Sequence, residues 1–105
     1  MVQYINTLSK FNSLISSGSL VVIDFTAKWC GPCLQMAPKF DELAAKYEKV
    51  QFFKVDVDDA SSIARQQGIS AMPTFHLYRN GNKVDEVVGA NIVQLQKKVA
   101  HYASS

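Results

Sequence analysis

The stretch Trp29-Cys30-Gly31-Pro32-Cys33 contains both cysteines of the chain and lies between an apolar run and a segment with helical spacing. Cysteines three residues apart at the start of a helix share one face, within reach of a disulfide bond. Pro32 suits a first helical turn because its missing amide hydrogen would have no partner there, and Gly31 lets another backbone approach closely. The stretch therefore predicts a helix N-terminus carrying two thiols that can join and separate without refolding.

The two sulfurs are not equivalent in this arrangement. The unpaired amides and the positive end of the helix dipole stabilise a thiolate on Cys30, which makes it the candidate nucleophile. Cys33 lies one turn further along, where its thiol is better covered and less ionised, so it is the candidate for resolving a mixed disulfide. The pair is thus predicted to react in one direction, with Cys30 first.

Three other interpretations of the cysteine pair are weaker. A structural disulfide that closes so short a loop removes little entropy from the unfolded chain. Half of a zinc site would need further ligands, and His76 and His101 lack the spacing of a ligand pair. Two unreactive core thiols would not need the Gly-Pro insert. A redox role is therefore favoured, and no metal site is expected.

The chain as a whole has the properties of one ordinary globular domain, residues 1–105. It has 48% hydrophobic and 19% charged residues and a formal net charge of +2, which is too small to indicate nucleic acid or an anionic membrane as partner. No apolar run is long enough to span a bilayer, and the N-terminus lacks the features of a secretory signal. We expect a monomer in a reducing compartment, the cytoplasm, although a processed organellar protein would have the same features.

The pattern of apolar residues predicts strands and helices in alternation. We expect strands over residues 2–5, 20–26, 50–57, 74–79 and 83–88, and helices over 8–15, from the cysteines to about 48 with a kink at Pro38, over 61–67, and from 92 onward with fraying at 103–105. Strand, helix and strand around the cysteines make a right-handed βαβ unit, with the pair at the carboxyl end of its first strand. Asn80-Gly81 predicts a hairpin, which makes the sheet mixed.

With this order of elements established, the chain resembles the thioredoxin family throughout its length, and the family's fungal members most. The resemblance is carried by several matching segments: Val22-Ile23-Asp24-Phe25, the Trp29–Cys33 stretch, Pro38, Phe53-Lys54-Val55-Asp56, Ala71-Met72-Pro73-Thr74, Asn80-Gly81 and Val88-Gly89-Ala90. It implies an α/β thioredoxin fold, a central mixed five-stranded sheet flanked by four helices. The chain departs from the family at Thr26, often aromatic, at Leu34, often Lys, and at Gln94, usually small; the first two flank the cysteines.

Asp24 lies in the middle of an apolar strand, where burial raises the pKa of a carboxyl group towards neutrality. The resemblance implies that Asp24 exchanges a proton with Cys33, through water, when the mixed disulfide resolves. Two alternatives are an ion pair with Lys54 and a strand register that leaves Asp24 exposed. Lys54 is implied to tune the site electrostatically, its alternative being a solvated lysine at a strand end.

Pro73 precedes a strand, where a trans peptide bond is the ordinary state. The resemblance instead implies a cis bond facing the cysteines, with the backbone of Met72 pairing with the substrate as an added strand. Trp29 offers an apolar face to a client protein, and small residues would complete a shallow groove beside it: Ala71, Gly89 and Ala90. Other aromatic and histidine residues are expected outside the site, as core (Phe11, Phe25, Phe40, Phe53 and Phe75) or as surface (His76 and His101).

The resemblance implies a protein disulfide reductase whose dithiol is restored by an NADPH-dependent flavoenzyme, thioredoxin reductase. Implied clients are peroxiredoxin, ribonucleotide reductase and methionine sulfoxide reductase. The sequence has no dinucleotide-binding fingerprint, so no flavin or nicotinamide should bind to this chain itself. Two alternatives stay open: an oxidant or isomerase of a secretory compartment, and a binding subunit of the same fold whose cysteines are incidental.

Overall fold

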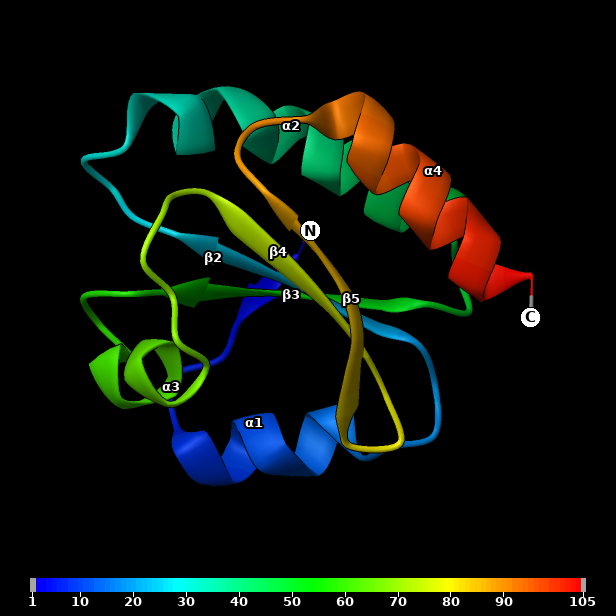
Figure 1. Ribbon diagram of the computed structural model, residues 1–105, viewed down its shortest axis with the longest axis horizontal. Helices are drawn as coiled ribbons and strands as arrows, with labels where there is room; N and C mark the ends of the chain where they lie inside the picture. The colour runs from blue at the N-terminus through cyan, green and yellow to red at the C-terminus, as the bar shows by residue number, and fades with distance from the viewer. Residues whose placement is uncertain (1, 105) are drawn as a thin grey trace.

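The computed structural model describes residues 2–104, which form a sheet with helices on both faces (Figure 1). In chain order its elements are β1 (Gln3–Tyr4), α1 (Leu8–Ile15), β2 (Val21–Thr26), α2 (Gly31–Lys46), β3 (Gln51–Asp56), α3 (Ser61–Gln66), β4 (Thr74–Arg79), β5 (Asn82–Val88) and α4 (Ile92–Ala103). Within the described residues these are five strands and four helices, so the predicted mixed sheet and its helices are confirmed.

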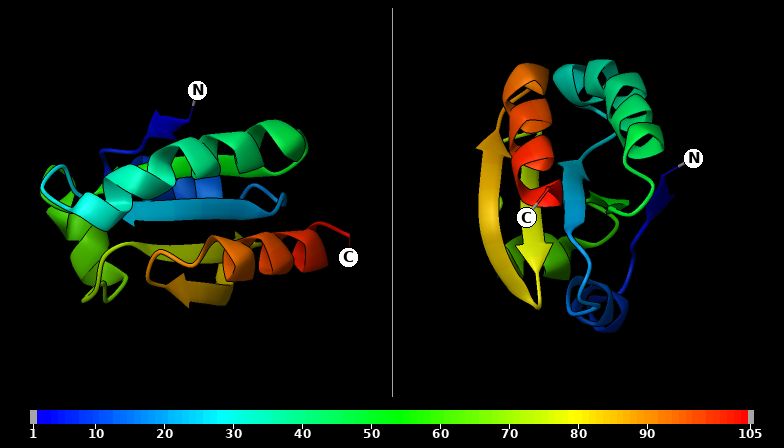
Figure 2. Two further views of the ribbon diagram at one scale, coloured as in Figure 1. Left: turned by 90° about the horizontal axis from the view of Figure 1, so that it is seen from above. Right: turned by 90° about the vertical axis from the view of Figure 1, so that its right-hand side faces the viewer.

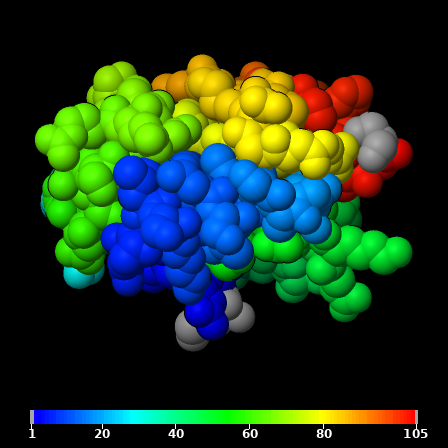
Figure 3. Space-filling model, turned by 90° about the horizontal axis from the view of Figure 1, so that it is seen from below, coloured from blue at the N-terminus to red at the C-terminus, as the bar shows by residue number. Residues whose placement is uncertain are grey.

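The strands lie in the order β1-β3-β2-β4-β5. β1, β2 and β3 are parallel, whereas β4 runs antiparallel to both β2 and β5. Helices α2 and α4 cover one face of the sheet, and α1 and α3 cover the other (Figures 1 and 2). Figure 3 shows the second face, where α1 (blue) and α3 (light green) lie side by side and the region of the β4–β5 hairpin (yellow) is visible beside them. Because β2 lies between β3 and β4 and is covered on both faces, all six of its residues are buried.

The ends of the elements differ from the sequence prediction by one or two residues. The long helix ends at Lys46 rather than near 48, and it continues through Pro38. The last helix extends to Ala103, where fraying was predicted; Ser105 lies outside the described residues. α4 begins where Asn91, its N-cap, accepts a hydrogen bond at Oδ1 from the amide of Gln94.

Buried side chains fill both faces of the sheet. On the α2 and α4 face, Phe40 packs against Phe52 and Phe75, with ring centroids 5.4 and 5.7 Å apart. Phe53, predicted as core, is only half-buried, because it points to the other face of β3 near the short edge strand β1. The two-residue period of the strand therefore gives Phe52 the fully buried position.

The prediction of a surface histidine at position 76 was wrong. His76 is 2% exposed, and its ring lies against that of Phe25. Because β4 is an interior strand covered on both faces, its polar residues cannot all point to solvent. His101 is exposed, as predicted.

Candidate active site

The two cysteines lie where the chain passes from β2 into α2, and a disulfide bond joins them. Cys30 is the N-cap of α2, and its Sγ accepts a hydrogen bond from the backbone amide of Cys33 at 3.2 Å. The exposed fraction is 5% for Cys30 and 1% for Cys33. Cys33 is therefore the more buried of the two, as predicted, but the difference is small. The Cα atoms are 5.2 Å apart, a separation that lets the bond close without moving the backbone.

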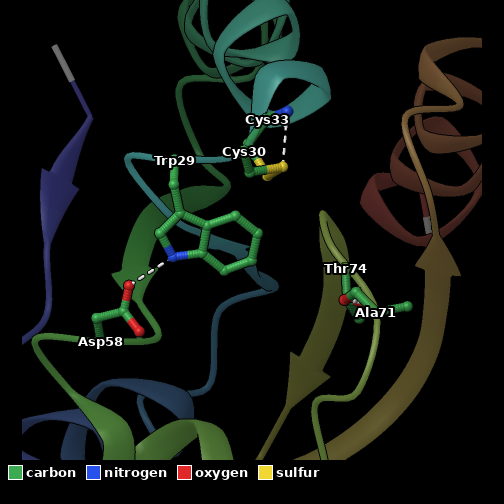
Figure 4. Close-up of a disulfide and its surroundings, with 6 residues drawn as sticks. All are labelled: Trp29, Cys30, Cys33, Asp58, Ala71 and Thr74. Carbon is green, nitrogen blue, oxygen red and sulfur yellow. Dashed lines mark hydrogen bonds between the residues drawn. A yellow bond between two sulfur atoms is a disulfide. The ribbon is translucent and has the colours of Figure 1, made fainter.

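Trp29 is the most exposed large apolar side chain near the pair, with 69% of its surface accessible. Its indole Nε1 donates a hydrogen bond to Asp58 Oδ2 at 2.7 Å, which fixes the ring beneath the cysteines (Figure 4). Asp58 lies in a turn ordered by Asp56, whose Oδ1 accepts from the amides of Asp58 and Asp59. Sequence reasoning did not assign Asp58 a role. An acidic turn after a parallel strand of the βαβ unit was the available signal, because such turns share one sheet edge with the cysteines.

The loop before β4 faces the cysteines. Met72 packs against the cluster that contains both sulfurs, and the Met72–Pro73 peptide bond is cis. The amide of Gly89 donates to the carbonyl of Pro73 at 2.8 Å, so the segment containing Gly89 and Ala90 lies beside this loop. At the end of the loop the Thr74 hydroxyl donates to the carbonyl of Ala71 at 2.7 Å (Figure 4). The structure thus places Met72 beside the sulfurs and Gly89 beside Pro73, while the docking groove itself stays a prediction.

Asp24 is buried, with 1% of its surface exposed, which excludes the alternative of a register that exposes it. It is the direct neighbour of Lys54 across the β2–β3 ladder. Its Oδ1 has no hydrogen-bond partner among the described residues. Burial raises the pKa of Asp24 to about 7, and the charge of Lys54 opposes this rise. A carboxyl group in this state can both accept and release a proton near neutral pH.

A second carboxylate acts on the same group. Asp41 lies on α2, and its negative charge adds to the rise in the pKa of Asp24. The Oδ1 atom of Asp41 is also buried without a hydrogen-bond partner within residues 2–104. Lys54 contributes the opposing positive charge, and its ammonium group lies 5.8 Å from the centre of the Tyr4 ring. Sequence reasoning found Asp24 and Lys54 but not Asp41, whose place in a mostly polar stretch of α2 gave no signal.

Neither a metal centre nor a membrane-spanning helix is found in the part of the chain that the structure describes. No group of three or more His, Cys, Asp or Glu side chains in residues 2–104 is arranged to hold a metal ion. No described helix is both long enough and apolar enough to cross a bilayer.

A cysteine pair at the N-terminus of a helix, beside a cis-proline loop, defines a thiol–disulfide exchange centre. The family model for thioredoxin matches residues 2–101. Thioredoxin-1 of Schizosaccharomyces pombe is 46% identical over 99 residues, which cover 94% of this chain and 96% of the relative. The chain belongs to the thioredoxin family, whose members are thiol–disulfide oxidoreductases.

Solved structures agree with this assignment. The thioredoxin of Malassezia sympodialis has a TM-score of 0.93 at 43% identity, covering 97% of this chain and 93% of that one. A chain from a study of the thiol resolving mechanism in yeast mitochondrial 1-Cys peroxiredoxin via glutathione/thioredoxin systems has a TM-score of 0.92 at 37% identity, covering 95% of this chain and 94% of that one. The sequence-based fold and family predictions are confirmed.

Proposed function

We propose that the protein reduces disulfides in client proteins by two exchange steps, in which Cys30 attacks and Cys33 resolves. The Cys30 thiolate forms a bond to one client sulfur and releases the other as a thiolate. The Cys33 thiolate then attacks Cys30 Sγ, forms the intramolecular disulfide and releases the second client sulfur. The client gains two electrons and, after protonation, two hydrogens, while the Cys30–Cys33 pair loses them. The observation that carries this proposal is the position of Cys30 at the N-cap of α2, where helix amides stabilise its thiolate.

Asp24 supplies the proton transfer that the second step needs. Cys33 must lose its proton to attack, and a carboxylate with a pKa near 7 accepts it at neutral pH. In the reverse direction the same group returns the proton. Lys54, the neighbour of Asp24 across the ladder, tunes this equilibrium by favouring the carboxylate. Gly31 and Pro32 serve the pair by shaping the first turn of α2 between the sulfurs.

The docking groove consists of the exposed face of Trp29 and the two segments that flank the cis-proline. Backbone groups of Met72 bind an extended client segment as an added strand, which aligns the client sulfur with Cys30. Ala71, Gly89 and Ala90 have small side chains, so they leave room for diverse client sequences.

The cycle is completed by partners. We assign regeneration of the dithiol to a thioredoxin reductase that uses NADPH, and we expect the clients to include peroxiredoxin, ribonucleotide reductase and methionine sulfoxide reductase. The similarity to a chain from the yeast peroxiredoxin study supports the first of these clients. The cytoplasm as compartment and the monomeric state stay predictions from the sequence.

The proposed function is tested by NADPH-coupled reduction of insulin with a thioredoxin reductase. The wild-type protein is expected to consume NADPH in proportion to insulin reduced, and Cys30→Ser to consume none. Cys33→Ser is expected to stop after one step with a stable mixed disulfide, detected as a covalent adduct by mass spectrometry. A pair that modest concentrations of glutathione already reduce would instead indicate an oxidant, and turnover by Cys30→Ser would exclude the cysteine mechanism.

A further inference from the structure

A chain of side-chain hydrogen bonds lies beneath the loop that joins α3 to β4. The Tyr78 hydroxyl oxygen is 2.7 Å from Gln67 Oε1 and 2.8 Å from His76 Nδ1. Tyr78 and His76 are both 2% exposed and, two residues apart on β4, point to the same face. Gln67 directly follows α3 and begins the loop that leads to Met72 and Pro73. We call Gln67, Tyr78 and His76 the buried polar chain.

The Tyr78 hydroxyl joins the other two members of the buried polar chain. It donates to Gln67 Oε1, which can only accept, and its oxygen lies within hydrogen-bond distance of His76 Nδ1. On the other side of the ring, Nε2 faces the Glu86 carboxylate at 3.5 Å. Burial, helped by the charge of Lys83, lowers the pKa of His76 to about 4, which keeps the ring neutral at pH 7.

The loop above the buried polar chain is only partly supported by packing. A hollow of about 160 Å³ lies against it, lined by Gln67, Ser70 and Ala71 on the loop side and by His76 and Glu86 on the sheet side, among other residues. Ser70 and Ala71 are exposed and Met72 is half-buried. Ile69 packs against the core of this face and Met72 against the cysteine cluster, and side-chain hydrogen bonds at the two ends of the loop add to this support. One is made by the Gln67 side chain at its start, and another joins Thr74 to the Ala71 carbonyl at its end.

Packing alone does not explain the polar atoms of this chain. The Tyr78 ring is already enclosed and contacts the Phe11 ring edge-to-face, with centroids 5.6 Å apart. A phenylalanine would fill the same space without burying a hydroxyl group, whose desolvation costs free energy unless it is hydrogen-bonded. The Tyr78 hydroxyl instead connects His76 on β4 with Gln67, the first residue of the loop.

We infer that Gln67, Tyr78 and His76 are positioning residues that hold the loop before Pro73 in the geometry in which the backbone of Met72 receives a client strand. This inference rests on the proposed function, since it assigns the buried polar chain a role in binding the polypeptide around the client disulfide. The buried polar chain does not touch the sulfurs. It therefore affects the binding of polypeptide clients and not the chemistry of Cys30. Small disulfides, which have no backbone to pair with Met72, should not depend on it.

The test compares a protein disulfide with a small one. The reduced protein reacts with insulin or with 5,5′-dithiobis(2-nitrobenzoate), and the second-order rate constant of each reaction is measured. Tyr78→Phe removes only the hydroxyl group, and we expect it to lower the rate constant for insulin about fivefold, the factor that corresponds to one net hydrogen bond. The rate constant for the small disulfide should stay unchanged. Gln67→Leu should have the effect of Tyr78→Phe, and Gln67→Glu, which keeps the acceptor oxygen, should restore the rate with insulin.

Ile5→Val is the matched control, because Ile5 is fully buried on the same face of the sheet and its truncation causes a comparable loss of stability. It should alter neither rate constant. Equal rate constants for wild type and Tyr78→Phe with both disulfides would overturn the inference, as would an equal decrease with both.

Amide hydrogen exchange of residues 68–72 gives a readout that does not depend on activity. Tyr78→Phe should speed exchange in this loop about tenfold, and Ile5→Val should not. If the wild-type protein reduces the small disulfide but not insulin, the proposed function fails while the exchange experiment still decides whether the buried polar chain holds the loop. Unchanged exchange in Tyr78→Phe would refute that role.

Discussion

Replacing Asp24 with Asn should stabilise the protein at alkaline pH and slow its second exchange step. Folding raises the pKa of Asp24 from 3.8 to about 7, so the native state holds its proton more tightly than the unfolded state. This difference lowers the free energy of unfolding. The loss is absent below the pKa of Asp24 in the unfolded state, grows as the pH rises towards 7, and is complete above its pKa in the native state. At 1.36 kcal/mol per pKa unit, a shift of about three units corresponds to about 4 kcal/mol.

Asn resembles the protonated carboxyl group and avoids this loss. We expect Asp24→Asn to raise the free energy of unfolding by about 2–4 kcal/mol at pH 8 and by much less at pH 4. Urea unfolding across this pH range measures the difference, and the m-value checks that the unfolding transition itself is unchanged. A variant that is less stable than wild type at pH 8, or whose advantage does not grow with pH, would refute the account of a buried carboxylate that resists ionisation.

The same substitution separates proton transfer from a structural role. Because Asp24→Asn cannot accept the proton of Cys33, release of the client from the mixed disulfide should slow at pH 7, while the first attack by Cys30 should keep its rate. Rapid-quench trapping of the mixed disulfide during a single turnover with insulin follows both steps. Unchanged resolution with reduced stability would instead assign Asp24 to an ion pair with Lys54.

The other predictions concern neighbouring charges and backbone geometry. The pKa of His76 is lowered from 6.5 to about 4, so its contribution to stability is lost as the pH falls through this interval, opposite in sign to that of Asp24; His76→Gln should therefore be the more stable relative to wild type the lower the pH, in urea unfolding from pH 7 to 4. Asp41→Asn should lower the pKa of Asp24, seen as a downward shift of the pH profile of client release, whereas Glu42→Gln, one exposed residue further along α2, should leave the profile in place. Gly89→Ala should cost about 1 kcal/mol or more in thermal or urea unfolding because φ is +97° there, and an unaltered stability would show that this segment relaxes.

The sequence predicted the fold because its signals are local and agree with one another. The cysteine pair at a helix start, the apolar strands on either side and Asn80-Gly81 in the hairpin each specify one connection, and the right-handed crossover of the βαβ unit leaves little freedom in how they assemble. The sulfurs and Asp24 could be found for the same reason. Each is a residue type that its surroundings make unusual: two thiols beside Gly-Pro, and a carboxylate within an apolar strand.

What the sequence did not reveal depends on partners that are distant along the chain. His76 was predicted at the surface, and only the place of β4 inside a sheet covered on both faces shows that it is buried. Asp58 gains its role from Trp29, which lies 29 residues earlier. Asp41 acts on Asp24 across the space between α2 and β2. Such pairings have no periodicity or spacing in the sequence, so they become visible only when the chain is folded.

The central claim is that Cys30 is the reactive member of the pair, and relative alkylation of the two reduced thiols tests it most directly. The protein is treated briefly with iodoacetamide at about pH 6, and the modified residue is identified by tandem mass spectrometry, because no lysine or arginine separates the cysteines and both lie on one tryptic peptide. We predict that Cys30 is modified roughly tenfold faster than Cys33, since Cys30 is the N-cap of α2, where the helix N-terminus stabilises its thiolate. Equal modification of both thiols, or faster modification of Cys33, would contradict the account.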